Sequence, residues 1–429
     1  MKERLAIIEG KRSAFCKAGT EFKGMQADQL GAVVVREVMA NSALQYQDID
    51  EVIIGNVAQP GHAANIARVI ALQGGFPEQV SAYTVNRNCA SGMESMTTAA
   101  NKIFAGEINT ALVGGSESMS SIPLLYGPKM TQFFMHLMMA KTPTAKLKVL
   151  SQFRLSFLKP IIGIELGLTD PVCGLNMGET AEVLAREFAI TREQQDMFAL
   201  NSHQLAIKAQ QEGKFSDEIV AVATAPKYEK IQQLDNGPRD GQTLEALAKL
   251  RPYFDRLAGS VTVGNACPIT DGAVAFTVMS ESQAKSMGLT PLGYLTDYSY
   301  AGLGGDRMGL GPAYATATLL EKSGLSMKEF DLIELNEAFA AQVIANQRAF
   351  ESKTFAKHYL QKSQAIGEID PAKLNVNGGA IALGHPVGAT GGRLILTLLH
   401  ELKRQGLQRG LATLCIGGGQ GAALTLEVE

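Results

Sequence analysis

The chain has 429 residues, of which 46% are hydrophobic and 19% charged, and its formal net charge is -3. This balance is that of an ordinary globular protein of two or three domains, and it excludes a disordered or collagen-like chain. With 39 basic residues against 42 acidic ones, the charge gives no reason to expect nucleic-acid binding. Glycine is in excess, because its 44 residues make up about a tenth of the chain. The globular average is about 7%.

Short apolar runs typical of β-strands alternate with amphipathic helical patterns along the chain. This alternation predicts an α/β protein with largely parallel sheets. In chain order, the clearest strands are expected at 51–54, 110–113, 331–335 and 411–415, and the clearest helices at 89–105, 178–212, 337–350 and 390–405.

Cys89 precedes the first of these helices, in the run NRNCASGMESM. The residues before it favour a strand, and the small residues after it suit a tight entry into the helix. A cysteine at a helix N-terminus lies among free N–H groups and near the positive end of the helix dipole, and both favour the nucleophilic thiolate. The alternative interpretation is a buried, inert cysteine.

The segment from Ile122 to Ile164 differs from the rest of the chain in charge. It contains six basic residues and no acidic one, and large apolar residues are interleaved with the basic ones. This composition predicts a helix on an anionic membrane surface or in the groove of a partner protein. A solvated lid over the core is an equal alternative. The basic residues are Lys129, Lys141, Lys146, Lys148, Arg154 and Lys159.

His385 lies in the glycine-rich run NGGAIALGHPVGATGGR, which leads into an apolar helical face. Glycines permit close backbone approach and positive φ before a helix. A phosphate-binding loop is excluded, because no GKS, GKT or clean GxGxxG follows a strand. A histidine on such a loop can act as the base for a thiol.

The second half of the chain has two more candidates at strand ends. Cys415 ends a predicted strand and opens CIGGGQG, whose glycines allow backbone N–H groups to face an oxyanion, although a plain hairpin turn is slightly favoured. Asn336, in LNEAFA, joins a strand to a helix, and its position alone favours a helix N-cap.

The two halves of the chain echo each other. The helix after Cys89 ends at Gly106 and leads to the strand TALVGGSES, and the helix 390–405 ends at Gly406 and leads to LATLCIGGGQG. The same order of helix, short connection, strand and glycine-rich corner predicts a duplicated pair of α/β halves.

The five cysteines form neither a disulfide framework nor a CxxC pair for zinc, so a reducing compartment and no metal are expected. The N-terminus has too short an apolar run for a signal peptide, and no apolar stretch approaches the length of a spanning helix. We therefore expect a cytoplasmic protein, at most peripheral to a membrane.

Taken together, these segments resemble the thiolase family over nearly the whole chain. The resemblance rests on several specific blocks in the family's order and not on one generic motif. The blocks are LAIIEGKRSAF, NRNCASGMESM, GGSESMS, GLTDPVCGLNMGETAE, KLRPYF, SVTVGNACPITDGA, NEAF, GGAIALGHPVGATGGR and CIGGGQGAA.

The resemblance implies a thiolase fold of two duplicated βαβαβαββ halves, packed as a five-layer α/β/α/β/α sandwich with an inserted loop domain. The corresponding boundaries are 1–121 plus 251–290 for the first half, 122–250 for the inserted domain and 291–429 for the second half. It also implies a homodimer or tetramer.

The resemblance further assigns roles at the site. Cys89 resembles the nucleophile that accepts the acyl group, His385 the base that deprotonates it, and Cys415 the cysteine that moves protons at the α-carbon. Asn336 resembles the residue that holds a water in one oxyanion hole, and the N–H groups of Cys89 and Gly417 resemble the other hole.

No cofactor is implied, because coenzyme A is a substrate. The implied substrate and CoA contacts are Met177, Leu250, Cys267 and Phe339. Cys267 stands where short-chain members commonly have a serine.

The expected activity is that of a 3-ketoacyl-CoA thiolase in fatty acid β-oxidation. The alternatives are acetyl-CoA C-acetyltransferase, a decarboxylating ketoacyl synthase, against which Cys415 argues, and a non-catalytic lipid carrier or scaffold. The long segment after residue 122 resembles that of trifunctional-complex β subunits, and this implies long-chain substrates and a hydratase/dehydrogenase α subunit. Those relatives often have His where this chain has Asn336.

Overall fold

The computed structural model describes residues 3–429. These residues form two compact units, one of residues 122–169 and one of the remaining chain on either side of it. The inserted domain expected at 122–250 therefore falls partly in each unit, and the three-part division stays a prediction.

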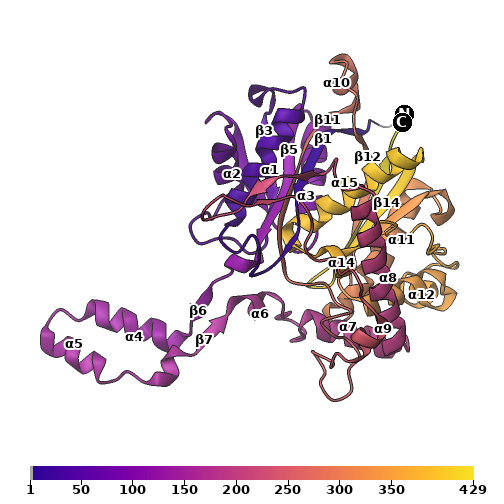
Figure 1. Ribbon diagram of the computed structural model, residues 1–429. Coiled ribbons are helices and arrows are strands. Elements are labelled where there is room, and N and C mark those ends of the chain that lie inside the picture. Colours follow the sequence, from indigo (N-terminus) through magenta and orange to yellow (C-terminus); the bar gives the residue numbers. More distant parts are fainter. Residues whose placement is uncertain (1–2) are drawn as a thin grey trace. The chain divides into compact units, whose positions relative to one another are not determined.

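The larger unit is built on an 11-stranded sheet (Figure 1). Its main path runs β13-β14-β15-β12-β1-β11-β5-β3-β4, and β2 and β8 pair with β11 and β1. The bounds, in that order, are Leu332–Leu335, Arg409–Ile416, Gln420–Glu427, Gly293–Gly302, Leu5–Ser13, Thr270–Ser280, Thr110–Ser118, Glu51–Gly55, Ser81–Val85, Cys16–Lys17 and Ile219–Val220.

The pairing of the strands differs from the expected parallel sheets. Parallel pairs occur toward the two ends of the path, between β13 and β14 and among β3, β4 and β5, and also between β1 and β8. The middle strands are antiparallel. The pair β14–β15 illustrates the reason, because a short glycine turn joins these strands and no crossover helix is needed.

Helices pack on both faces of the strands. α3 (Ser91–Phe104) and α15 (Val387–Gln405) contact each other, and α15 contacts strands of both halves. α3, α1 (Ala27–Asn41) and α2 (Ile66–Gly74) cover first-half strands, and α11 (Gly311–Ser323) covers second-half strands. The further helices are α7 (Met177–Glu187), α8 (Arg192–Gln211), α9 (Leu244–Ala248), α10 (Glu281–Ser286), α12 (Ala340–Glu351), α13 (Lys353–Tyr359) and α14 (Ala380–Leu383).

The internal echo is confirmed at the level of elements. α3 ends at Phe104 and leads through Gly106 to β5, and α15 ends at Gln405 and leads through Gly406 to β14. Both glycines have positive φ, which ends each helix at low conformational cost. The helix expected over 178–212 is in fact two helices, because Thr191 caps a new N-terminus.

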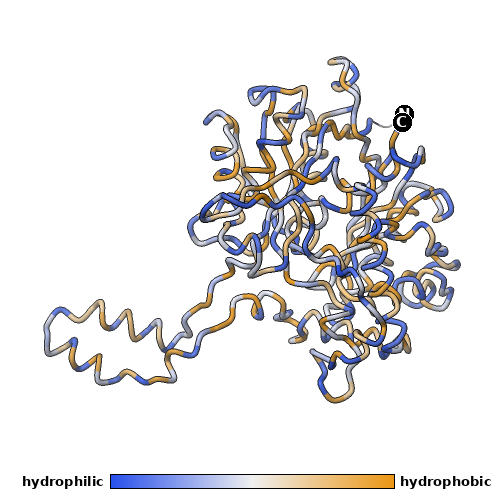
Figure 2. The backbone as a smooth tube through the Cα atoms, viewed as in Figure 1, coloured by the Kyte–Doolittle hydropathy of each residue, from blue (hydrophilic) through white to orange (hydrophobic). Residues whose placement is uncertain are grey.

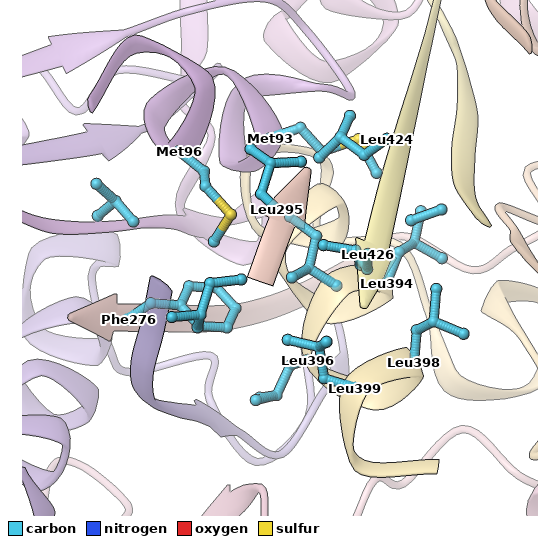
Figure 3. Packing of buried hydrophobic residues seen from close by; sticks show 14 of the residues in the cluster. Met93, Met96, Phe276, Leu295, Leu394, Leu396, Leu398, Leu399, Leu424 and Leu426 are labelled. Carbon is cyan, nitrogen blue, oxygen red and sulfur yellow. The ribbon is translucent and has the colours of Figure 1, made fainter. Parts of the chain in front are cut away.

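The main hydrophobic core surrounds α3 and α15 (Figure 3). Met93 and Met96 of α3, Leu394 of α15, Phe276 of β11 and Leu424 of β15 are all fully buried there. Apolar residues at helical spacing on α3 and α15 therefore face strands from both halves of the chain. This packing fixes the two helix N-termini that carry the candidate site.

The smaller unit contains an antiparallel ribbon of β6 (Leu124–Tyr126) and β7 (Pro160–Ile162) and the helices α4 (Pro128–Met139) and α5 (Pro143–Leu150). A short 3-10 turn and α6 (Gly163–Gly167) complete it. Apolar and polar residues alternate along its length (Figure 2). Among residues 3–429, no helix has the length and hydropathy needed to cross a membrane.

Candidate active site

Cys89 lies in the turn between β4 and α3, two residues before the helix begins. The Ser91 hydroxyl closes this turn, because its oxygen accepts the Arg87 N–H at 2.9 Å and donates to the Asn88 carbonyl at 2.7 Å. Cys89 is partly exposed. The nucleophile candidate is thus held in a fixed turn and can be reached by a substrate.

The electrostatics of Cys89 differ from the sequence-based expectation of a thiolate. Burial raises the pKa of the Cys89 thiol, whereas hydrogen bonds from the N–H groups of Gly417 and of Cys89 itself lower it. Burial is the largest influence, and Cys89 lies outside the first turn of α3, whose N-cap is Ala90. The resting sulfur is therefore a neutral thiol, which needs a base.

His385 lies between α14 and α15 and is buried. Its Nδ1 is 2.6 Å from the Thr390 hydroxyl oxygen, and its backbone N–H donates to the hydroxyl of Thr270. Burial lowers the pKa of His385 to about 3, and the charge of Arg393 adds to the effect. The imidazole is therefore neutral at physiological pH and has a nitrogen available to accept a proton.

Glycines bring the helix that follows Cys89 close to the helix that follows His385. A side chain at Gly92 would meet the backbone nitrogen of Gly392 at 2.8 Å, and one at Gly391 would meet Met93 at 2.9 Å. Larger residues would separate the two helix N-termini. The expected close backbone approach is thus confirmed, and here it serves helix packing.

Cys415 and Gly417 lie where β14 turns into β15. Cys415 is buried, and burial together with the nearby sulfurs of Cys89 and Cys267 raises the pKa of its thiol well above the ordinary value. Three thiols therefore gather at this point. Gly417 packs beside Met177, whose sulfur would lie 3.2 Å from any side chain placed at Gly417.

Asn336 is fully buried, and neither its Oδ1 nor its Nδ2 has a hydrogen-bond partner within residues 3–429. Its backbone N–H donates to the Thr413 carbonyl at 3.0 Å, which fixes Asn336 beside β14. The N-cap of α12 is Phe339, so the N-cap interpretation of Asn336 is wrong. A buried amide without protein partners is suited to hold a water or a ligand atom.

The four expected CoA and substrate contacts fall in two hydrophobic clusters. Met177, Cys267 and Phe339 belong to the cluster that contains Cys415, whereas Leu250 packs in a neighbouring cluster with Leu247. Burial raises the pKa of Cys267 to about 12, and the neighbouring Cys89 adds to the effect. Cys267 is therefore a neutral thiol close to the candidate nucleophile.

Sequence reasoning missed the role of Glu117, although its motif GGSESMS was noticed. The fully buried carboxylate accepts four hydrogen bonds, including those from the Val57 and Gly388 N–H groups at 3.1 and 3.0 Å. Burial raises the pKa of Glu117 to about 7. Glu117 thereby ties the loop after β3 to the first turn of α15.

A second feature without a sequence signal is a narrow basic cleft. Lys17, His203 and Arg239 line it together with Ala266 and Pro268, which flank Cys267. Burial, Arg239 and Lys17 together lower the pKa of His203 to about 4, so this histidine is neutral beside the two cations. Such a cleft suits an anionic group such as a phosphate.

Within the described residues, no group of three or more His, Cys, Asp or Glu side chains could hold a metal ion.

Comparisons with known proteins agree with this fold. The model for the N-terminal domain of thiolase matches residues 5–282, and that for the C-terminal domain matches residues 289–428. The chain therefore belongs to the thiolase family, has the thiolase fold expected from the sequence, and is an acyltransferase.

Individual relatives are similar over their full length. A 3-ketoacyl-CoA thiolase from Yersinia pestis is 43% identical over 428 residues, which cover 100% of this chain and 97% of the relative. An acetyl-CoA acetyltransferase from Bacillus anthracis has a TM-score of 0.87 at 37% identity, with 100% and 99% coverage. Human mitochondrial 3-ketoacyl-CoA thiolase in complex with CoA has a TM-score of 0.85 at 33% identity, with 100% and 98% coverage.

Proposed function

We propose that this thiolase is a 3-ketoacyl-CoA thiolase of fatty acid β-oxidation, which cleaves 3-oxoacyl-CoA with CoA through an acyl-Cys89 intermediate. Full-length similarity to proteins of that name supports the substrate class. The observation that carries the mechanism is the meeting of the Cys89 turn, the Cys415–Gly417 strand end and the N-terminus of α15.

In the first step, the Cys89 sulfur attacks the 3-keto carbon and its proton passes to His385. Both groups are neutral at rest, so the proton moves as the carbon–sulfur bond forms. The N–H groups of Cys89 and Gly417 stabilise the oxyanion that develops at the 3-keto oxygen. A well-placed donor of this kind contributes about 3 kcal/mol.

In the second step, the bond between C2 and C3 breaks and leaves the enolate of acetyl-CoA. Asn336, through a held water, and His385 stabilise the enolate oxygen, and the unpaired buried amide of Asn336 supports this role. Cys415 donates its proton to C2. Its raised thiol pKa keeps that proton in place until the basic enolate carbon appears.

In the last step, the Cys415 thiolate takes the proton of the CoA thiol, and the resulting CoA thiolate attacks the acyl-Cys89 carbonyl and releases the shortened acyl-CoA. The departing Cys89 sulfur recovers its proton from His385, so both cysteines are thiols again. The free enzyme then begins another cycle, so ping-pong kinetics are expected. Met177, Leu250, Cys267 and Phe339 form the acyl and CoA contacts in this proposal. Lys17 and Arg239 bind a phosphate of CoA in the basic cleft beside Cys267.

Acetyl-CoA C-acetyltransferase is the second candidate, because the similar structure from Bacillus anthracis has that activity in its name. The two activities share every proposed catalytic group and differ in the accepted acyl chain. A non-catalytic carrier or scaffold is a remote third candidate, since all the proposed catalytic groups are present.

The proposal is tested by thiolysis of 3-oxoacyl-CoA with acyl chains of 4 and 16 carbons, by wild type and by the Cys89→Ala and Cys415→Ala variants. We expect both variants to lose turnover, while Cys415→Ala still accepts an acyl group on Cys89, detected by mass spectrometry. Acyl transfer to the Cys89→Ala protein would overturn the nucleophile assignment. A clear preference for 4 carbons would favour the acetyltransferase and reject long-chain preference.

We also propose two contacts beyond the substrate. Segment 122–164 binds an anionic membrane surface, or alternatively a hydratase/dehydrogenase α subunit, and the chain forms a homodimer or tetramer. A cytoplasmic location agrees with the contact made by segment 122–164 and with the oligomer. The exposed apolar side chains of segment 122–164 support its contact with a membrane or an α subunit. The open edge of β4 supports the homodimer or tetramer.

A further inference from the structure

Asn88, the residue before Cys89, has an unusual backbone. Its φ is +45°, a left-handed conformation that non-glycine residues rarely adopt and that asparagine tolerates better than most. Its N–H donates to the Asn86 side chain at 2.9 Å, and its carbonyl accepts both the N–H and the hydroxyl of Ser91. These bonds fix the direction in which the Asn88 side chain leaves the turn.

The Asn88 side chain crosses from the first half of the chain to the second. Its Nδ2 donates to the Gly417 carbonyl at 2.8 Å, between residues 329 positions apart. The turn Gly417–Gly419 has no side chains of its own, so bonds from its surroundings must hold it. Asn88 holds the Gly417 carbonyl, and the Leu303 N–H holds the Gly419 carbonyl at 2.8 Å.

The same turn supplies a donor to the nucleophile. The Gly417 N–H faces the Cys89 sulfur and acts to lower its pKa. A donor of this kind is effective only when it is held to within a fraction of an ångström.

We infer that Asn88 is a positioning residue that fastens the glycine turn 417–419 to the Cys89 turn. The Gly417 N–H is thereby held beside the Cys89 sulfur in the free enzyme and is in place for the oxyanion when that sulfur reacts. This role rests on the proposed function of Cys89. Asn88 itself is exposed, so a small replacement leaves the fold intact.

The test compares Asn88→Gly with Asn88→Ala. Glycine keeps the left-handed backbone without cost and removes only the amide, whereas alanine removes the amide and adds backbone strain. We expect kcat to fall about tenfold or more in both variants with KM within about twofold of wild type, because donor misplacement acts on the transition state. The pH midpoint for alkylation of Cys89 by iodoacetamide should move upward in both, because the charged sulfur loses a hydrogen bond.

Gln361→Gly is the matched control, since Gln361 is also exposed and has φ +56° at a position distant in sequence from the site. It should match wild type in kcat and in alkylation midpoint. Asn88→Gly should share its thermal unfolding midpoint, whereas the backbone strain in Asn88→Ala should lower that midpoint. If Asn88→Gly behaves like wild type, the inference is overturned, whether or not Asn88→Ala is impaired. If wild type still turns over after complete alkylation of Cys89, the proposed function itself fails.

Discussion

At the scale of residues, the tautomer of His385 follows from a single hydroxyl. Thr390 has one hydroxyl hydrogen, which it donates to the Pro386 carbonyl at 3.0 Å, one turn back along α15. His385 Nδ1, 2.6 Å from the same oxygen, must then carry the imidazole proton. That leaves Nε2 unprotonated, and Nε2 is the nitrogen that can accept the Cys89 proton.

In Thr390→Val, the hydroxyl that holds His385 in a single tautomer is therefore removed, while the shape of the side chain is kept. We expect kcat to fall about 10-fold to 100-fold, because general-base catalysis depends on the unprotonated nitrogen, and Thr390→Ser should retain most activity. Nitrogen-15 NMR of histidine-labelled protein, with His385→Ala to assign the signal, should show mixed tautomers only in the valine variant. With a pKa of about 3, His385 should stay neutral across the working range of pH in all other forms. An unchanged tautomer in Thr390→Val would contradict this account.

The sequence alone was enough to select the candidate residues whose side chains are themselves reactive. Cys89, His385 and Cys415 stand out because thiols and imidazoles beside glycine-rich turns are rare. Sequence reasoning assigned no role to Glu117, Asn88 or Thr390, because carboxylate, amide and hydroxyl side chains are common. Their positions become informative only through partners that lie far away in the chain or one helical turn distant.

At the scale of elements, the smaller unit has an unusual surface. Met138, Leu155 and Leu147 expose 84%, 80% and 69% of their surface, among basic side chains with no acidic one from 122 to 164. Monomeric soluble proteins rarely leave so much apolar surface uncovered. Phe133 and Phe153 pack together at 5.4 Å and give the unit a small core of its own, so the exposed residues are free to make other contacts.

The chain should consequently float with anionic liposomes at low salt, and Lys146→Glu with Lys148→Glu on α5 should reduce its binding more than tenfold. Each basic residue near such a surface contributes about 1 kcal/mol. The matched control is Lys353→Glu with Lys357→Glu, also two exposed lysines on one short helix, α13. Absence of flotation in wild type would reject the membrane contact, and a stable complex with an α subunit would then favour the partner instead.

Element order was also more predictable than strand direction. The alternation of strands and helices predicted the α/β class and the repeated helix–strand unit. It could not predict the antiparallel middle of the sheet, because short hydrophobic runs look alike in either direction. Hydrogen bonding between β1, β11 and β12 joins segments nearly 300 residues apart, and no local pattern encodes that pairing.

At the scale of the whole molecule, the two ends of the sheet path differ. β13 makes a further bridge at Ile333 with Leu374, whereas the outer edge of β4 has no strand beside it in the described chain. Its residues Tyr83 and Val85 are only half-buried. An open edge strand next to the proposed nucleophile is a natural site for a second copy of the chain.

We therefore expect light scattering to give the mass of a dimer or tetramer. Ala82→Lys in β4 should shift it toward monomer, because a lysine on an edge strand opposes pairing. Ser286→Lys, at the exposed end of α10, should leave the mass unchanged. A monomeric wild type would reject the oligomer, and an oligomer indifferent to Ala82→Lys would move the interface elsewhere.

The repeated halves have a consequence for how the reaction is divided between them. Cys89 stands two residues before α3, and His385 stands two residues before α15, the equivalent helix of the other half. The proposed nucleophile and the proposed base thus occupy corresponding positions of the two repeats. One corner supplies the thiol that reacts in the proposed mechanism, and the equivalent corner supplies the imidazole that takes its proton.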